Sequence, residues 1–279
     1  MEELLHELER ASISIKGRIS GCLQGDYAGR KLGNSYDFYG TRPYIEGDDI
    51  RNIDWKGYAR SENIYTRLFS EQKRINVTVF VDNSSSMDFG TPTKWEESKL
   101  YSLGISYIAL KELNRLSIYS FNDKIELNLK GLNEKKQIYY IKDRLDEIKP
   151  CGKTDLTKSI CVCEQKGGLI FIITDLLCDK VNSFLDIVSE KYEKCVLIHV
   201  MSDMELNPNI EGNIKLIDKE TGKYTVKEIN EREVRKYKNN LNQFIDDCRF
   251  QCEKRGIRYV FAKKYSSPAE IILKAIEVE

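Results

Sequence analysis

The sequence has no excess of charge of one sign, no long apolar run and very few histidines. Its 279 residues include 44 Lys+Arg and 44 Asp+Glu, so the formal net charge is zero. This balance argues against broad nucleic-acid or membrane-surface binding, which depends on excess positive charge. No stretch approaches the roughly 20 apolar residues that span a bilayer, and the charged residues 1–17 contain no apolar signal core. We therefore expect a cytoplasmic protein without a membrane span.

The sequence also lacks the motifs of soft-metal and nucleotide sites. Eight cysteines are scattered without a CxxC pair, and only His6 and His199 could join them as ligands. Zinc and iron–sulfur sites usually need closely spaced pairs, so we expect reduced, structural cysteines. The glycine-rich stretches lack the lysine and hydroxyl pair of a P-loop. ATP hydrolysis would therefore have to come from a partner.

From about residue 76, short apolar strands alternate with amphipathic helices. The predicted strands are Asn76–Asp82, Arg115–Phe121, Lys124–Leu129, Leu169–Thr174, Cys195–Val200 and Ile257–Ala262. The predicted helices are Trp95–Leu110, Gln137–Ile148, Val181–Lys191, Leu241–Arg255 and Pro268–Ile276. This rhythm predicts an α/β domain over 76–279, with a doubly wound, mostly parallel sheet. A polar segment near 202–230 is expected to form a loop or small hairpin insertion.

Residues 1–75 do not follow that rhythm. A short charged helix precedes a glycine-rich stretch at 21–25 and a segment rich in glycines and aromatics. Such composition is typical of turns and short strands. We therefore predict a separate N-terminal unit over 1–75, mainly β or irregular.

The segment VFVDNSSSM carries the candidate site. Asp82 directly follows an apolar strand, and Ser84 and Ser86 take the next alternate positions. A carboxylate and two hydroxyls in a tight loop offer three oxygen ligands. Mg²⁺ prefers oxygen ligands and usually retains several waters, so few protein ligands are needed.

Two further candidate oxygen donors come later in the sequence, in a loop before a helix and at the end of a strand. Thr154 lies in GKTDL, before a short helix, and Asp175 closes the strand in FIITD. Ligands of doubly wound sheets gather at the carboxyl ends of the strands. Taken singly, each residue has an ordinary explanation as a turn or helix cap. Their joint order and strand-end placement favour a metal site.

VFVDNSSSM, GKTDL and FIITD together resemble the metal-ion-dependent adhesion site of von Willebrand factor A domains. The resemblance implies that Asp82, Ser84, Ser86, Thr154 and Asp175 bind Mg²⁺, with Mn²⁺ as the alternative, directly or through water. A partner's carboxylate would then complete the coordination of the metal. The usual second glycine before the threonine is Lys153 here, and Thr157 is the fallback ligand.

The segment YIEGDDIRNIDW, at residues 44–55, followed by Ala59 and Arg60, resembles the bacterial domain-of-unknown-function-58 family. SDMELNP, LIDKETGKY and CEKRGIRYV extend this resemblance over nearly the whole chain. Members of this family often accompany MoxR-type AAA+ ATPases, which implies a role in assembling or activating other proteins. Many relatives have N-terminal membrane helices, which are not expected here.

Acids and arginines alternate within this segment. Asp48, Asp49 and Asp54, with Arg42, Arg51 and Arg60, are expected to form ion pairs and turn caps, since alternating charges neutralise one another. A second acidic metal site and a docking surface for the ATPase are the alternatives. Ile53 and Trp55 are expected to be buried anchors.

The sequence thus favours a metal-dependent protein-binding module that is not an enzyme. The partner is expected to present an Asp or Glu, and no nucleic acid is expected to bind. The alternative is a Mg²⁺-dependent phosphatase or hydrolase that uses Asp82 at its strand end. That chemistry normally needs a second aspartate two residues later as acid or base, where this chain has Ser84.

Overall fold

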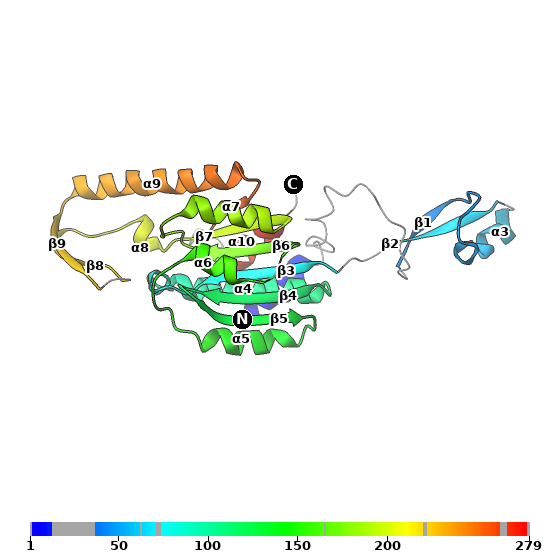
Figure 1. Ribbon diagram of the computed structural model, residues 1–279, viewed down its shortest axis with the longest axis horizontal. Helices are drawn as coiled ribbons and strands as arrows, with labels where there is room; N and C mark the ends of the chain where they lie inside the picture. The colour runs from blue at the N-terminus through cyan, green and yellow to red at the C-terminus, as the bar shows by residue number, and fades with distance from the viewer. Residues whose placement is uncertain are drawn as a thin grey trace. The chain divides into compact units, whose positions relative to one another are not determined.

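The computed structural model describes residues 2–12, 37–61, 63–70, 74–164, 166–219, 222–262 and 267–277 (Figure 1). The chain divides into two compact units. The first contains the N-terminal helix together with the chain from Ile75 onward, and the second is Gln24–Arg74. The glycine-rich stretch at 21–25 lies outside the described residues.

The first unit alternates strands and helices almost as predicted. In chain order its elements are α1 (Glu2–Ser12), β3 (Asn76–Asp82), η2 (Ser85–Met87), α4 (Lys94–Lys111), β4 (Arg115–Phe121), β5 (Ile125–Leu132), α5 (Gln137–Asp146), α6 (Leu156–Val162), β6 (Leu169–Thr174), α7 (Val181–Lys191), β7 (Lys194–Val200), α8 (Asp203–Leu206), β8 (Gly212–Ile217), β9 (Tyr224–Ile229), α9 (Glu231–Glu253), β10 (Arg258–Ala262) and α10 (Pro268–Ile276).

Six strands form one sheet in the order β10-β7-β6-β3-β4-β5. All neighbouring pairs are parallel except β4 and β5, which are antiparallel. The central strands β3 and β6 are apolar almost throughout because both faces of a parallel sheet are covered. This is the expected α/β fold with a mostly parallel sheet. Its topology brings the carboxyl ends of β3 and β6 side by side.

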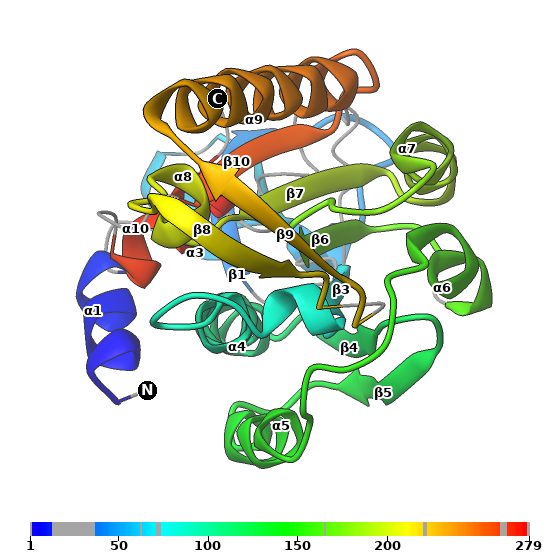
Figure 2. The same cartoon turned by 90° about the vertical axis from the view of Figure 1, so that its left-hand side faces the viewer.

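Helices cover both faces of this sheet (Figure 2). One apolar core lies beneath α4, α5 and α10, and the other lies beneath α6, α7 and α9. Aromatic rings reinforce the second core, where Phe80 of β3 stacks on Phe121 of β4 with ring centroids 4.0 Å apart. Both faces of the sheet are thus buried against apolar side chains.

Helix α1 packs on the α/β unit, which differs from the predicted division at residue 75. Its Leu4 and Leu8 are buried in the same core as α4 and α10. The three helices approach closely at Gly104, where a Cβ atom would lie 2.2 Å from Ile272 Cδ1 and 3.1 Å from Leu8 Cδ1. The sequence pattern did not reveal this packing because α1 is separated from α4 by the whole second unit.

The second unit is a small β-hairpin structure with helical turns. It contains β1 (Asp37–Pro43), η1 (Ile50–Asn52), α3 (Trp55–Ser61) and β2 (Tyr65–Ser70), and β1 and β2 pair antiparallel. Ile53 is 6% exposed, as expected of an anchor, and it forms an isolated bridge with Thr66. The expectation for Trp55 is wrong, because its side chain is 55% exposed. Trp55 is the first residue of α3, a helix of seven residues in which no residue is buried.

Helix α9 differs most in extent from the sequence prediction. Helix α9 begins ten residues earlier than predicted, at Glu231, with the Asn230 side chain accepting a bond from Glu233 N. Its first half is largely exposed, so it lacks the apolar stripe on which the prediction relied. The insertion expected near 202–230 comprises α8 and the hairpin β8–β9. Among the described residues, no helix has the length and apolar character needed to cross a bilayer.

The packing of α1 predicts that Leu8→Ala destabilises the α/β unit. Leu8 is fully buried, so its truncation should lower the free energy of unfolding by about 2–4 kcal/mol. Urea denaturation of the full chain measures this. His6→Ala, on the exposed side of α1, is the control and should change stability by less than about 0.5 kcal/mol. Equal stability of the wild type and Leu8→Ala would contradict the observed packing.

Candidate metal and docking site

Asp82 lies at the carboxyl end of β3, fully buried between β4 and β6. Its Oδ1 accepts a hydrogen bond from Ser84 N at 2.9 Å, and its Oδ2 accepts one from Thr174 Oγ1 at 2.8 Å. Thr174 is the last residue of the neighbouring strand β6. The parallel register of β3 and β6 therefore fixes the orientation of this carboxylate.

The two serines that follow turn back over the strand end. Ser84 precedes the 3-10 turn η2, and its carbonyl accepts a bond from Met87 N at 3.0 Å. The hydroxyl oxygens of Ser84 and Ser86 lie 3.0 Å apart, within hydrogen-bonding distance. Asp82, Ser84 and Ser86 thus lie together on one tight loop.

The loop of Thr154 lies against this serine loop. Cys151 N donates to Asn83 O at 2.9 Å, and Ser85 N donates to Gly152 O at 3.0 Å. Gly152 has a φ of +74°, a left-handed conformation that glycine adopts readily. The next segment starts α6, whose N-cap is Asp155.

Thr154 is half-buried beside this loop, and Thr157 is half-buried in the first turn of α6. The structure therefore brings the Thr154 loop to the same edge of the sheet as Asp82. It does so even though Lys153 replaces the usual glycine.

Asp175 directly follows β6 and is fully buried. Its Oδ1 accepts a bond from Leu177 N at 3.0 Å, and its Oδ2 accepts one from Lys94 Nζ at 2.8 Å. The turn passes through Leu176, whose φ of 55° is unusual for a residue with a side chain. This conformation directs Leu177 N back toward the carboxylate.

Lys94 and Glu205 extend the site beyond the residues that the sequence indicated. The Lys94 ammonium is completely buried and also donates to Glu205 Oε1 at 2.7 Å. Burial opposes its charge, but the carboxylates of Asp175 and Glu205 outweigh that effect and raise the pKa of Lys94. Glu205 belongs to α8, so this ion triad joins the ends of α4, β6 and α8.

The electrostatic balance at Asp82 is unfavourable. Burial, and then the negative charge of Asp175, raise the pKa of Asp82 from its ordinary 3.8 to about 7. The hydrogen bonds from Ser84 and Thr174 lower the pKa and offset only part of this shift. A cation placed between the two carboxylates would relieve the repulsion.

His199 supports the main chain of Asp175 from β7. Its Nε2 lies 3.0 Å from the carbonyl oxygen of Asp175, and its Nδ1 lies 2.6 Å from Tyr259 Oη. A carbonyl only accepts, so Nε2 carries the proton and Nδ1 accepts from the Tyr259 hydroxyl. Burial lowers the pKa of His199 to about 4, so the ring is neutral near pH 7.

The donor set at this edge fits a hard divalent cation. It consists of oxygen atoms from two carboxylates and from hydroxyl groups, and it contains no sulfur. Asp82, Ser84, Ser86, Thr154 and Asp175 would hold such an ion, directly or through water. Neither here nor elsewhere in the described residues do three or more His, Cys, Asp or Glu side chains gather to hold a metal, so hydroxyl oxygens would have to supply the remaining ligands.

The acids of the second unit pair with arginines. Asp48 pairs with Arg42 at 2.6 Å, and Asp49 pairs with Arg51 at 2.7 Å while capping η1. Asp54 pairs at 2.8 Å with Arg67, a residue that the sequence analysis did not consider, and not with Arg60. These bonds engage the carboxylates that the alternative acidic metal site would require.

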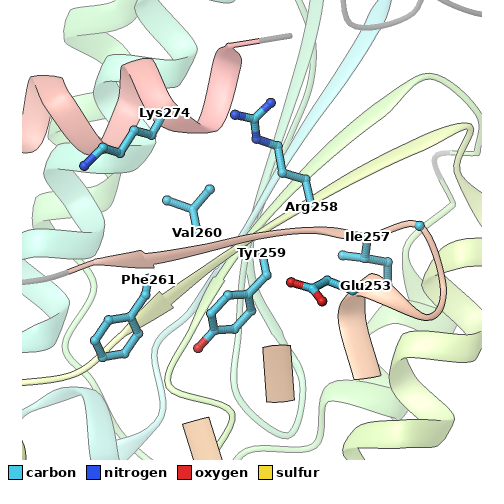
Figure 3. A pocket seen from close by; sticks show the side chains of 8 residues that line it. Glu253, Ile257, Arg258, Tyr259, Val260, Phe261 and Lys274 are labelled. Atoms are coloured by element: carbon cyan, nitrogen blue, oxygen red, sulfur yellow. The ribbon is translucent and has the colours of Figure 1, made fainter. Parts of the chain in front are cut away.

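A separate groove of about 570 Å³ runs along the edge strand β10. Figure 3 shows Tyr259 and Phe261 on one side of the strand and Arg258 and Val260 on the other. None of the residues that line this groove belongs to the predicted metal site. The groove therefore contributes no ligand to the site at the carboxyl ends of β3 and β6.

The family described as "Protein of unknown function DUF58" matches residues 40–243. The chain belongs to the DUF58 family. Similar proteins include Uncharacterized protein Mb1516 of Mycobacterium bovis and Uncharacterized protein Rv1480 of Mycobacterium tuberculosis. Each is 32% identical over 230 residues, which cover 79% of this DUF58 protein and 72% of the relative.

Solved structures with lower similarity include the conserved hypothetical protein BatB from Bacteroides thetaiotaomicron. It is 16% identical with a TM-score of 0.46, and the match covers 72% of this DUF58 protein and 97% of BatB. The VWA domain of SpRpn10 is 9% identical with a TM-score of 0.41, over 74% and 100% of the two chains. Sequence identities and TM-scores this low support no inference about function.

The raised pKa of Asp82 predicts that Asp82→Asn stabilises the metal-free protein at pH 8. The wild type bears the cost of the buried charge fully above pH 7, and this cost disappears as the pH falls toward 4. Chemical denaturation in EDTA should therefore show the variant more stable by about 2–4 kcal/mol at pH 8, with the difference shrinking toward pH 4.

The exposed Asp143 of α5 provides the matched control. Asp143→Asn should leave the stability close to that of the wild type throughout this pH range. A stability difference for Asp82→Asn that does not change with pH would contradict the electrostatic account of Asp82.

Proposed function

We propose that this DUF58 protein is a metal-dependent protein-binding module that captures an acidic residue of its partner. Mg²⁺, or alternatively Mn²⁺, is held by Asp82, Ser84, Ser86, Thr154 and Asp175 at the strand edge. The partner supplies an Asp or Glu that completes the coordination. The protein acts as an adaptor in the assembly or activation of other proteins and is not itself an enzyme.

The juxtaposition of two buried carboxylates at one strand edge is the observation that carries this proposal. Burial, and then the negative charge of Asp175, raise the pKa of Asp82, and the hydroxyl groups of Ser84 and Ser86 lie on the loop that follows it. Lys94 bonds to Asp175 and Glu205 but not to Asp82, so a further cation would offset the buried charge of Asp82. Because the protein supplies few charged ligands, a bound Mg²⁺ retains attraction for an incoming carboxylate.

The phosphatase alternative has less support from the arrangement. The position of the usual acid or base is occupied by Ser84, whose hydroxyl bonds with Ser86. Asp175 is followed by Leu176 and Leu177 rather than by a second acid.

We propose a MoxR-type AAA+ ATPase as the partner, because members of the family often accompany such ATPases. The chain lacks a P-loop, so this partner would supply the ATP hydrolysis. The cytoplasmic location expected from the sequence stays a prediction.

Calorimetric titration of Mg²⁺ into EDTA-treated protein tests the metal requirement. The wild type should show one saturable site, whereas Asp82→Ala should show none, because it loses the buried carboxylate of the site. Asp143→Ala removes an exposed acid from α5 and should bind like the wild type. Equal binding by the wild type and Asp82→Ala would refute the assignment of the metal to this strand edge.

Pull-down of the purified MoxR-type ATPase of the same organism then tests the partner. Capture should occur with Mg²⁺ and fail both in EDTA and with Asp82→Ala. Capture of equal strength under all three conditions would show that the docking does not use the metal.

A further inference from the structure

Lys94 places a positive charge directly on a predicted metal ligand. Lys94 opens α4, where Thr93 and Glu96 form a capping box that fixes the start of the helix. Its side chain is 0% exposed, and its ammonium lies 2.8 Å from Asp175 Oδ2. Lysines are almost never fully buried unless they are paired, so this arrangement has a specific local cause.

Glu205 holds the ammonium from the other side. One of its oxygens, Oε1, accepts from Lys94, while Oε2 accepts from Ser202 N at 2.8 Å and from Ser202 Oγ at 3.0 Å. Asp175 is equally constrained by its bond from Leu177 N. The three charged groups therefore have little freedom to rearrange independently of α4, β6 and α8.

The order of charges along this triad determines its effect on a metal. The negative charge of Asp175 acts on Asp82. Lys94 pairs with Asp175, and Glu205 pairs with Lys94. A cation near Asp82 and Asp175 meets the repulsion of Lys94 at shorter range than the attraction of Glu205. Lys94 thus opposes metal binding, and Glu205 partly offsets Lys94.

We propose that Lys94 is an internal counter-cation that weakens divalent-metal binding until a partner's carboxylate joins the site. This inference rests on the proposed function and adds how that site is regulated. The partner's carboxylate supplies the negative charge that Lys94 neutralises on Asp175. Metal and partner therefore bind cooperatively, each raising the affinity for the other.

The hairpin β8–β9 lies at the same edge and joins the triad to the exposed surface. Its strands follow α8, which carries Glu205, and Lys219 beyond β8 pairs with Asp88 at 3.2 Å. Asp88 directly follows η2, the turn of the serine loop. A partner seated at the strand edge therefore meets a segment that is connected to both sides of the metal site.

Lys94→Met tests the inference with Mg²⁺ alone as the probe. Removing the charge should raise the calorimetric affinity for Mg²⁺ by at least about tenfold, because the repulsion at Asp175 is lost. The metal-free variant should be less stable than the wild type, since Asp175 and Glu205 lose their shared partner. Saturating Mg²⁺ should raise its thermal midpoint by more than it raises that of the wild type.

Glu205→Gln changes the affinity in the opposite direction. Glutamine can keep the capping box of α8 but no longer neutralises Lys94. Its Mg²⁺ affinity should fall by at least about threefold. This variant keeps the inference testable if Lys94→Met does not fold. Lys99→Met, which removes a partly exposed charge from the same helix, is the control and should bind Mg²⁺ like the wild type.

The outcomes separate this inference from the proposed function. If the wild type binds Mg²⁺ and Lys94→Met binds it no more tightly, the counter-cation role is overturned and the metal site stands. Tighter binding by Glu205→Gln would overturn the role in the same way. If neither the wild type nor Lys94→Met binds Mg²⁺, the metal site is refuted and the inference falls with it.

Discussion

Two buried carboxylates, at the carboxyl ends of the neighbouring parallel strands β3 and β6, determine which groups must surround them. The register of β3 and β6 brings Asp82 beside Thr174 and sets Asp175 one residue beyond it. Buried charges are costly unless they are paired. Lys94, His199 and the backbone of Leu177 surround Asp175, while Ser84 and Thr174 bond to Asp82. The rest of the sheet holds these groups in place.

The strand-end residues could be predicted because their placement depends on local pattern and topology. An apolar strand that ends in Asp82, and another that ends before Asp175, place both acids at one edge once the sheet is parallel. The turn chemistry of the serine loop could be predicted in the same way. The sequence thus yielded the fold class and the meeting of these loops, whereas metal binding itself stays a prediction.

The remainder of the site could not be predicted because it depends on long-range packing. A lysine at the start of a helix usually projects into solvent, yet Lys94 lies buried and bonds to residues 81 and 111 positions away. Glu205 is an ordinary capping-box residue by sequence, and His199 is an isolated histidine within a strand. Only the crossing of α4, β6, β7 and α8 gives these residues a shared role.

The second unit shows the opposite limitation. Alternating charges correctly suggested ion pairs for Asp48 and Asp49, but the partner of Asp54 comes from β2 rather than from the same segment. Trp55 was expected to be a buried anchor, yet it lies on a seven-residue helix in which no described residue is buried. Burial of an aromatic residue thus depends on an available neighbour as well as on hydrophobicity.

We propose that a divalent cation binds beside Asp82 and Asp175. Anomalous diffraction from crystals grown with Mn²⁺ tests it most directly, since Mn²⁺ scatters anomalously and shares the oxygen ligands of Mg²⁺. One anomalous peak is expected at the carboxyl ends of β3 and β6, in contact with Asp82, Ser84 and Ser86. A peak beside Asp48, Asp49 and Asp54 instead, or none at the strand edge, would contradict it.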